Sequence, residues 1–168
     1  MIIKKTPLLA LFLLISVVSN AYIKNNTFLY AGRLDVLQEN KVVLIGTAAS
    51  ITFNFTGTEC SILLQSIDSW EHHNYVALEL DGEYIGKYRV EKGAAQSFPI
   101  KVISNKKVHT LSIYKATEAT MGNVVFLGTT AKLTAITAKK KKKIEFIGDS
   151  ITCGAAYDPS INNPHQYF

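Results

Sequence analysis

Alternation of apolar and polar residues over short segments most constrains how this chain can fold. Residues 50–55 read SITFNF, so Ile51, Phe53 and Phe55 would lie on one face of a β-strand and their polar neighbours on the other. This pattern is typical of a strand with one face in a core and one face near solvent. Further segments of the same kind follow at 60–65, 75–80 and 109–114.

Strand-like segments recur from about Phe28 to Ile136, and none of the sequence between them has a helical period. Asp81-Gly82 stands between two such segments and predicts a type I′ hairpin turn, which requires two positive φ angles. Residues 124–127 are continuously apolar, which predicts a strand buried on both faces. We therefore predict a mainly β protein, with a jelly-roll β-sandwich over residues 22–138.

Composition and charge exclude several classes of protein. A hydrophobic fraction of 48% excludes intrinsic disorder. The formal net charge is +5, but seven of the eighteen basic residues are Lys4, Lys5 and the run 139–143. The remaining eleven face thirteen acidic residues, so we do not expect a nucleic-acid partner. The lysine run at 139–143 is typical of a solvated linker, and the alternative is a contact with an acidic polymer or anionic lipid.

Residues 1–21 have the pattern of a secretory signal peptide. Lys4 and Lys5 precede an apolar stretch over 8–18, and Ala21 supplies the small residue before the cleavage site. The apolar stretch is shorter than the roughly 20 residues of a membrane span, although an uncleaved anchor remains the alternative. We expect a secreted or periplasmic protein that does not contact the membrane after cleavage.

The cysteines and histidines give weaker signals. Cys60 and Cys153 fall in different expected domains, which favours two half-buried thiols over the alternative of a disulfide. We interpret His72-His73 as part of a solvated loop, with a metal site as the alternative, and His109 as a surface residue. Packing is the simpler role for Trp70 and Tyr75, with sugar stacking as the alternative. We predict no metal and no cofactor.

A serine follows the last strand-like segment. Residues 144–147 read as a strand, and Gly148-Asp149-Ser150 follow at once as a turn into a helix. A nucleophilic serine needs its Oγ at the end of a rigid element, with backbone N–H groups nearby to hold an oxyanion. Gly148 permits the tight turn, and a helix N-terminus favours negative charge at Ser150. The same tripeptide is also an ordinary loop in which Ser caps a helix.

Longer motifs make the context more specific. Residues 144–154 read IEFIGDSITCG and resemble the first block of the GDSL, or SGNH, serine hydrolases. The continuation TCG at 152–154 resembles the carbohydrate esterase family 2 branch, the acetylxylan esterase-like enzymes. Upstream, YAGR at 30–33 and YKATEA at 114–119, leading into VVFLG at 124–128, resemble the N-terminal β-sandwich of that branch.

The resemblance implies a secreted esterase that removes acetyl groups from plant-cell-wall polysaccharides such as xylan. It implies a jelly roll packed on a three-layer α/β hydrolase domain. Ser150 matches the nucleophile, and its own N–H would be one oxyanion donor. Asp149 matches the acidic position that supports the turn, and Gly148 matches the turn itself.

The sequence departs from this pattern after Ser150. Similar enzymes take further oxyanion donors from a Gly and an Asn, and their general base is the His of an Asp-x-x-His block. No such block is present, since Asn162 stands three residues before His165. We expect residues 144–168 to be an incomplete start of the hydrolase domain, and this chain alone to be inactive.

Two functions of different class remain open. The first is an esterase acting on acetylated polysaccharide, or on another acylated glycan or small ester. The second is a non-catalytic β-sandwich module, binding carbohydrate or structural, with a vestigial hydrolase start. The sequence makes no prediction of oligomeric state.

Overall fold

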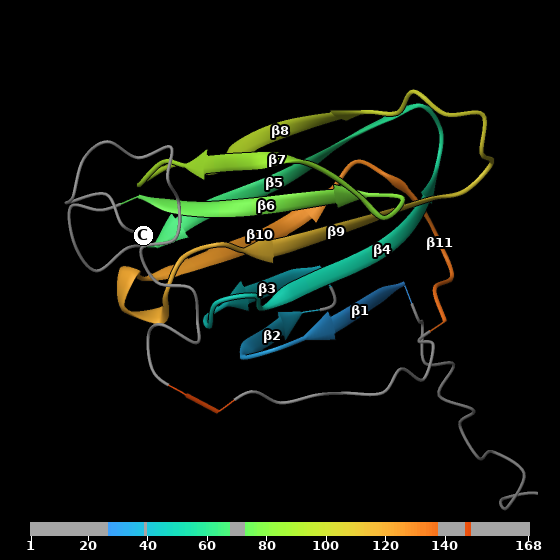
Figure 1. Cartoon of the computed structure of the whole chain (residues 1–168). Coiled ribbons are helices and arrows are strands. Elements are labelled where there is room, and N and C mark those ends of the chain that lie inside the picture. Colours follow the sequence, from blue (N-terminus) through green and yellow to red (C-terminus); the bar gives the residue numbers. More distant parts are fainter. Residues whose placement is uncertain (1–26, 39, 68–72, 138–146, 149–168) are drawn as a thin grey trace, which may run out of the picture.

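A computed structural model describes residues 27–38, 40–67, 73–137 and 147–148. These residues form two antiparallel sheets packed as a sandwich (Figure 1). The first sheet has the order β1-β4-β9-β6-β7 with β11 also pairing β4, and the second has the order β2-β3-β10-β5-β8. Strands β7 and β8 lie along the top of the view in Figure 1, and β1 and β2 lie along the bottom.

The first sheet comprises β1 (Phe28–Ala31), β4 (Ser50–Thr56), β6 (Asn74–Leu80), β7 (Glu83–Val90), β9 (His109–Lys115) and β11 (Lys132–Thr134). The second comprises β2 (Leu34–Gln38), β3 (Lys41–Leu44), β5 (Glu59–Ile67), β8 (Gln96–Lys101) and β10 (Asn123–Thr129). The helical element of the described residues is a short 3-10 turn, η1 (Ala119–Met121). No helix in this part of the chain is long and apolar enough to cross a membrane.

The core is built from the inward faces of the alternating strands. Ile51, Phe53 and Phe55 are fully buried, and Thr52 and Asn54 between them are only partly covered. Phe28 and Phe53 of the first sheet each contact Phe126 of the second, with ring centroids 5.8 and 6.3 Å from Phe126. The predicted β-sandwich is therefore confirmed, and large apolar side chains from both sheets close it.

The predicted hairpin and the predicted central strand are also confirmed. Asp81 and Gly82 join β6 to β7 with φ angles of 56° and 92°, as a type I′ turn requires. Strand β10 lies between β3 and β5, and Val124, Val125 and Phe126 are all buried.

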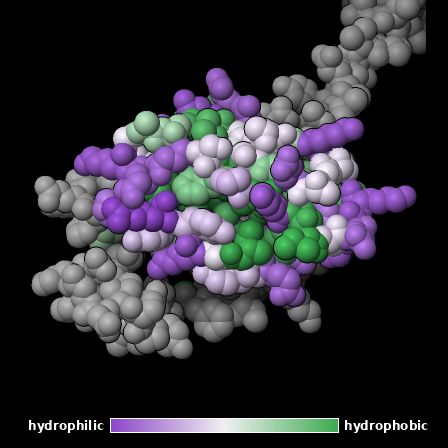
Figure 2. Space-filling model, turned by 90° about the horizontal axis from the view of Figure 1, so that it is seen from above, coloured by the Kyte–Doolittle hydropathy of each residue, from purple (hydrophilic) through white to green (hydrophobic). Residues whose placement is uncertain are grey.

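The outer strands β7 and β8 carry features that discourage pairing with another chain. Pro99 lies within β8 and lacks a backbone donor, and a bulge interrupts β7 opposite Leu78 and Glu79. Figure 2 shows the molecule from above the view of Figure 1, and on this face hydrophobic patches lie among hydrophilic side chains. Ile85 of β7 and Phe98 of β8 are only partly buried.

Two predictions about single residues are wrong. His109, predicted at the surface, is 1% exposed, because the alternation of β9 points it into the sandwich with Leu111. Cys60, predicted to be half-buried, is 5% exposed, because it lies on the inward face of β5. The signal peptide, the linker and Cys153 lie outside the described residues, so those predictions stay predictions.

Candidate functional site

The predicted catalytic turn is described only at its first residue. Gly148 is exposed, and Ile147 before it is 92% exposed. Asp149 and Ser150 lie outside the described residues. The roles predicted for these residues therefore stay predictions.

His73 belongs to a surface cluster with Arg89 and Glu91. Its Nδ1 lies 3.3 Å from Oε2 of Glu91, and its Nε2 contacts the guanidinium of Arg89. Arg89 Nε in turn lies 2.9 Å from Oε1 of Glu91. The described residues contain no group of three side chains placed to hold a metal ion, and His72 lies outside them. Arginine is not a metal ligand, and this cluster consists of the Arg89–Glu91 ion pair with the His73 ring beside it.

Tyr75 is placed on the outer face of the first sheet. The Lys87 ammonium lies over its ring, 5.0 Å from the centroid, which is a cation–π contact. One face of the ring is therefore covered, and the predicted packing role fits this better than sugar stacking on that face. Trp70 lies outside the described residues.

A buried polar network, which the sequence analysis missed, fills one end of the sandwich. The Asn74 amide donates to Ser66 Oγ at 3.0 Å and to the Met121 carbonyl at 3.2 Å, and its Oδ1 accepts from the Thr117 hydroxyl. The network ties the β5–β6 region to the loop between β9 and β10. Since buried polar groups need partners, these bonds fix the path of that loop.

Lys115 brings a buried ammonium group to this end of the sandwich. Its side chain is 1% exposed, and its Nζ donates to the carbonyls of Thr117 and Glu118 at 2.7 and 2.6 Å. Burial lowers the pKa of this ammonium from 10.5 to about 8, and the Glu118 carboxylate partly opposes the shift. The sequence does contain a signal for this burial. In the alternation of β9, Lys115 shares the inward face with Leu111 and Ile113.

A carboxylate–imidazole pair lies at the opposite end. The Nδ1 of His109 is 2.8 Å from Oδ2 of Asp81, and the Thr110 N–H donates to Oδ1 at 2.9 Å. Lys106 Nζ lies 3.6 Å from the same carboxylate. Burial alone would raise the pKa of the Asp81 carboxyl, but these hydrogen bonds and the Lys106 charge bring it below its usual value. The pair has the geometry of a base and its orienting acid, yet the imidazole is too buried to meet a substrate.

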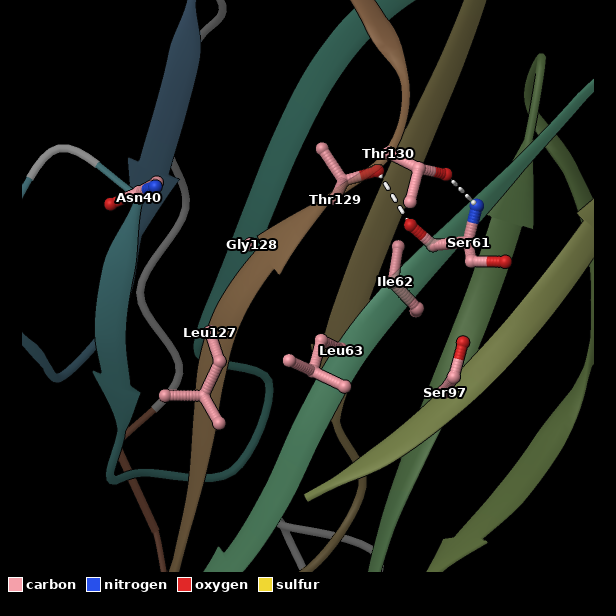
Figure 3. A pocket seen from close by; sticks show the side chains of 9 residues that line it. All are labelled: Asn40, Ser61, Ile62, Leu63, Ser97, Leu127, Gly128, Thr129 and Thr130. Carbon is pink, nitrogen blue, oxygen red and sulfur yellow. Dashed lines mark hydrogen bonds between the residues drawn. The ribbon is translucent and has the colours of Figure 1, made fainter.

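A hollow of about 290 Å³ lies on the outer face of the second sheet (Figure 3). It forms at the point where strand β10 stops pairing with β3. The β10–β3 ladder ends at Phe126 opposite Val42, while the β10–β5 ladder continues past a bulge to Thr129. Gly128 follows the bulge and has no side chain to fill the gap. The residue pattern of β10 does not reveal this hollow, because the bulge interrupts the alternation of inward and outward residues.

The lining of the hollow is neutral and of mixed polarity. Leu63 and Leu127 supply apolar surface between the strands, and none of the lining residues is charged. Five of them carry a hydroxyl or amide group: Asn40, Ser61, Ser97, Thr129 and Thr130. The hollow can therefore receive a small neutral molecule with both C–H faces and hydroxyl groups.

Most of this chain matches the sequence model of a known protein family. The family model described as carbohydrate esterase 2 N-terminal matches residues 30–154, which include most of the sandwich and the whole Gly148-Asp149-Ser150 turn. The chain belongs to this family. The resemblance found from the motifs is thereby confirmed.

Individual relatives agree with this assignment. The cellulase/esterase CelE of Acetivibrio thermocellus is 34% identical over 149 residues, which cover 86% of this chain and 17% of CelE. A family two carbohydrate esterase from Clostridium thermocellum, solved in complex with cellohexaose, matches with a TM-score of 0.68 and 29% identity. That match covers 83% of this chain and 44% of the solved one.

An active site mutant of a Clostridium thermocellum family two esterase has also been solved. It matches with a TM-score of 0.66 and 31% identity, over 79% of this chain and 40% of that one. This chain therefore spans less than half the length of CelE and of the two solved esterases.

Proposed function

We propose that the longer protein containing this chain is a secreted serine esterase that removes acetyl groups from plant-cell-wall polysaccharide such as xylan. The observation that carries the proposal is the family match over residues 30–154, because it runs from the β-sandwich through the motif that contains Ser150. The esterase relatives CelE and the Clostridium thermocellum enzymes support carbohydrate as the substrate class. The pattern of residues 1–21 supports secretion.

In the proposed mechanism Ser150 Oγ attacks the acetyl carbonyl carbon. A histidine supplied by a segment outside this chain takes the proton from Oγ, and the sugar oxygen leaves with that proton. The Ser150 backbone N–H is one of the donors that hold the oxyanion. Water then releases acetate from the acyl-serine by the same steps in reverse. Asp149 and Gly148 hold the turn that presents the nucleophile.

The test uses the longer protein and the ester 4-nitrophenyl acetate. Ser150→Ala should lower kcat by at least about a thousandfold, since it removes the atom that forms the covalent bond. Ser160→Ala in the same segment is the matched control and should leave kcat unchanged. Equal activity of Ser150→Ala and the parent would overturn the nucleophile assignment.

The substrate is tested separately. Acetylated xylan and its chemically deacetylated form are incubated with the enzyme, and released acetate is measured. Acetate from the first and none from the second supports the proposal. Activity confined to small esters, with no acetate from any acetylated polysaccharide, would restrict the enzyme to small esters.

A further inference from the structure

We propose that the hollow on the outer face of the second sheet binds a pyranose unit of a neutral polysaccharide. That the ligand belongs to a polysaccharide rests on the proposed function. The location and the chemistry of the ligand follow from the residues that line the hollow.

The hollow offers hydrogen-bonding groups that have no partner. The side chains of Asn40, Ser61 and Ser97 make no hydrogen bond within the described part of the chain, although they line the same depression. Thr130 Oγ1 accepts from the Ser61 N–H at 2.8 Å, which leaves the Thr130 O–H free to donate outward. Figure 3 shows Ser97 reaching the hollow from β8, and Asn40 standing across from it on the β3 side. A hydroxyl-rich ligand could therefore bind without displacing any internal bond.

The hollow also offers apolar surface of suitable size. Leu63 is 37% exposed, and Leu127 lies beside it on the neighbouring strand. A pyranose ring presents axial C–H groups on its faces and hydroxyls around its edge, which matches apolar surface bordered by amide and hydroxyl groups. The volume of 290 Å³ lies at the small end of ligand pockets, enough for one or two rings. The neutral lining favours an uncharged sugar over a uronic acid or a phosphate.

The outer face of the first sheet is less suited to this role. Its polar side chains already bond one another, since Thr52 donates to Ser112 at 2.9 Å and Thr110 donates to Asn54 at 2.8 Å. Binding there would exchange existing bonds for new ones with little gain. This face therefore serves as an internal reference in the experiment.

The test is a titration of the full chain, labelled with nitrogen-15, with unacetylated cellohexaose and xylohexaose. We expect amide shifts at Ser61, Ser97 and Gly128, and none at Thr52 or Ser112. Ser97→Tyr fills the hollow from an exposed strand position and should weaken binding at least about tenfold. Lys101→Tyr is the matched control, because it adds the same ring to the same face of β8, roughly 13 Å away, and it should bind like the parent.

A milder variant guards against misfolding. Ser61→Ala removes one hydroxyl without adding bulk and should weaken binding about threefold. Absence of shifts with both sugars, shifts confined to the first sheet, or equal binding by parent and Ser97→Tyr would each overturn the proposal. Because the probes carry no ester, failure here leaves the role of Ser150 untouched. Loss of activity in Ser150→Ala likewise has no bearing on the hollow.

Discussion

The His109 imidazole lies 2.8 Å from the Asp81 carboxylate, although 28 residues separate them in the sequence. Asp81 occupies the first position of the β6–β7 turn, and its own N–H donates to the Thr110 carbonyl at 2.8 Å. The side chain and backbone of one turn residue thus hold the start of β9 against the hairpin. His109 also packs on Phe55, with ring centroids 5.6 Å apart, so the pair joins the hairpin to the core.

Removal of this carboxylate should destabilise the sandwich. Asp81→Gly accepts the φ of 56° without strain but leaves the Thr110 N–H and His109 Nδ1 without their acceptor, which should lower the free energy of unfolding by about 1–3 kcal/mol. Urea denaturation followed by circular dichroism gives the value. Glu83→Ala, at an exposed position just after the same turn, is the control and should cost much less. Equal losses in the two variants would show that the Asp81 hydrogen bonds contribute nothing.

The lowered pKa of the Asp81 carboxyl group predicts how the stability of the fold depends on pH in acid. Because the pKa of Asp81 is lowered in the folded chain, its ionised form stabilises the fold above the usual carboxyl value of 3.8. This contribution disappears as pH falls from that value through the lower folded pKa. Asp81→Asn cannot titrate, so the stability difference between parent and variant should shrink on acidification. A difference that stays constant from about pH 6 to about pH 2 would contradict the prediction.

The sequence predicted strands and the hairpin where local chemistry decides them. Alternation located the central strands, and Asp81-Gly82 identified its turn because few residue pairs accept two positive φ angles. The burial of His109 was recoverable from the alternation of β9, where it shares a face with Leu111. Its partner Asp81 was not, because Asp81 is distant in sequence and reaches His109 only when β6 and β9 pair. The hollow was missed for a related reason, since a bulge in β10 has meaning only beside the neighbouring strands. Lys115 was recoverable, because its position on β9 shares a face with Ile113.

The lowered pKa of Lys115 predicts that this residue stabilises the fold more as the pH becomes alkaline. Its folded pKa of about 8 lies below its usual 10.5, so between these values the unfolded chain binds more protons than the folded chain. The Lys115 contribution to stability should therefore increase with pH, by up to about 1.4 kcal/mol per pH unit, and it is seen alone below the 9.0 at which the Cys60 thiol of the unfolded chain titrates with the opposite sign. Lys115→Met should remove this slope, and Lys101→Met at an exposed site should keep it. Urea denaturation from about pH 7.5 to about pH 9 measures both variants, and a slope unchanged by Lys115→Met would refute the assignment.

Cys60 should be unreactive in the folded chain. Burial raises its pKa from 9.0 to about 11, with a hydrogen bond to Thr129 partly opposing the shift, and this lowers the thiolate fraction at about pH 8 roughly a hundredfold. Alkylation by iodoacetamide, followed at the Cys60 peptide by mass spectrometry, should be at least that much slower than in guanidinium chloride.

The same experiment tests the alternative of a disulfide with Cys153. A bridged Cys60 would resist alkylation in denaturant until a reductant is added. A free Cys60 would react in denaturant at once. Rapid alkylation in the folded chain would instead contradict the burial of this thiol.

Gly32 marks the tightest approach of backbone that the structure shows at a glycine. It has a φ of +83°, and a Cβ added there would lie 2.8 Å from Ala49 Cα. The turn that it forms lets the next residue, Arg33, accept hydrogen bonds from Ile45 and Gly46, so the β1–β2 turn is fastened to the β3–β4 loop. A substitution at Gly32 must either move this loop or lose these bonds.

Gly32→Ala should therefore destabilise the chain more than backbone strain alone explains. Gly82→Ala is the matched control, because Gly82 has a similar positive φ, +92°, but has no atom within 4 Å of an added Cβ. Both variants bear the strain of a left-handed alanine, about 1–2 kcal/mol, and the excess at Gly32 measures the clash with Ala49. We expect an excess of about 1–3 kcal/mol in urea denaturation. Equal losses of unfolding free energy in the two variants would mean that the β3–β4 loop moves away from the added Cβ at no cost. Gly32 of the YAGR motif would then be required only for its positive φ angle.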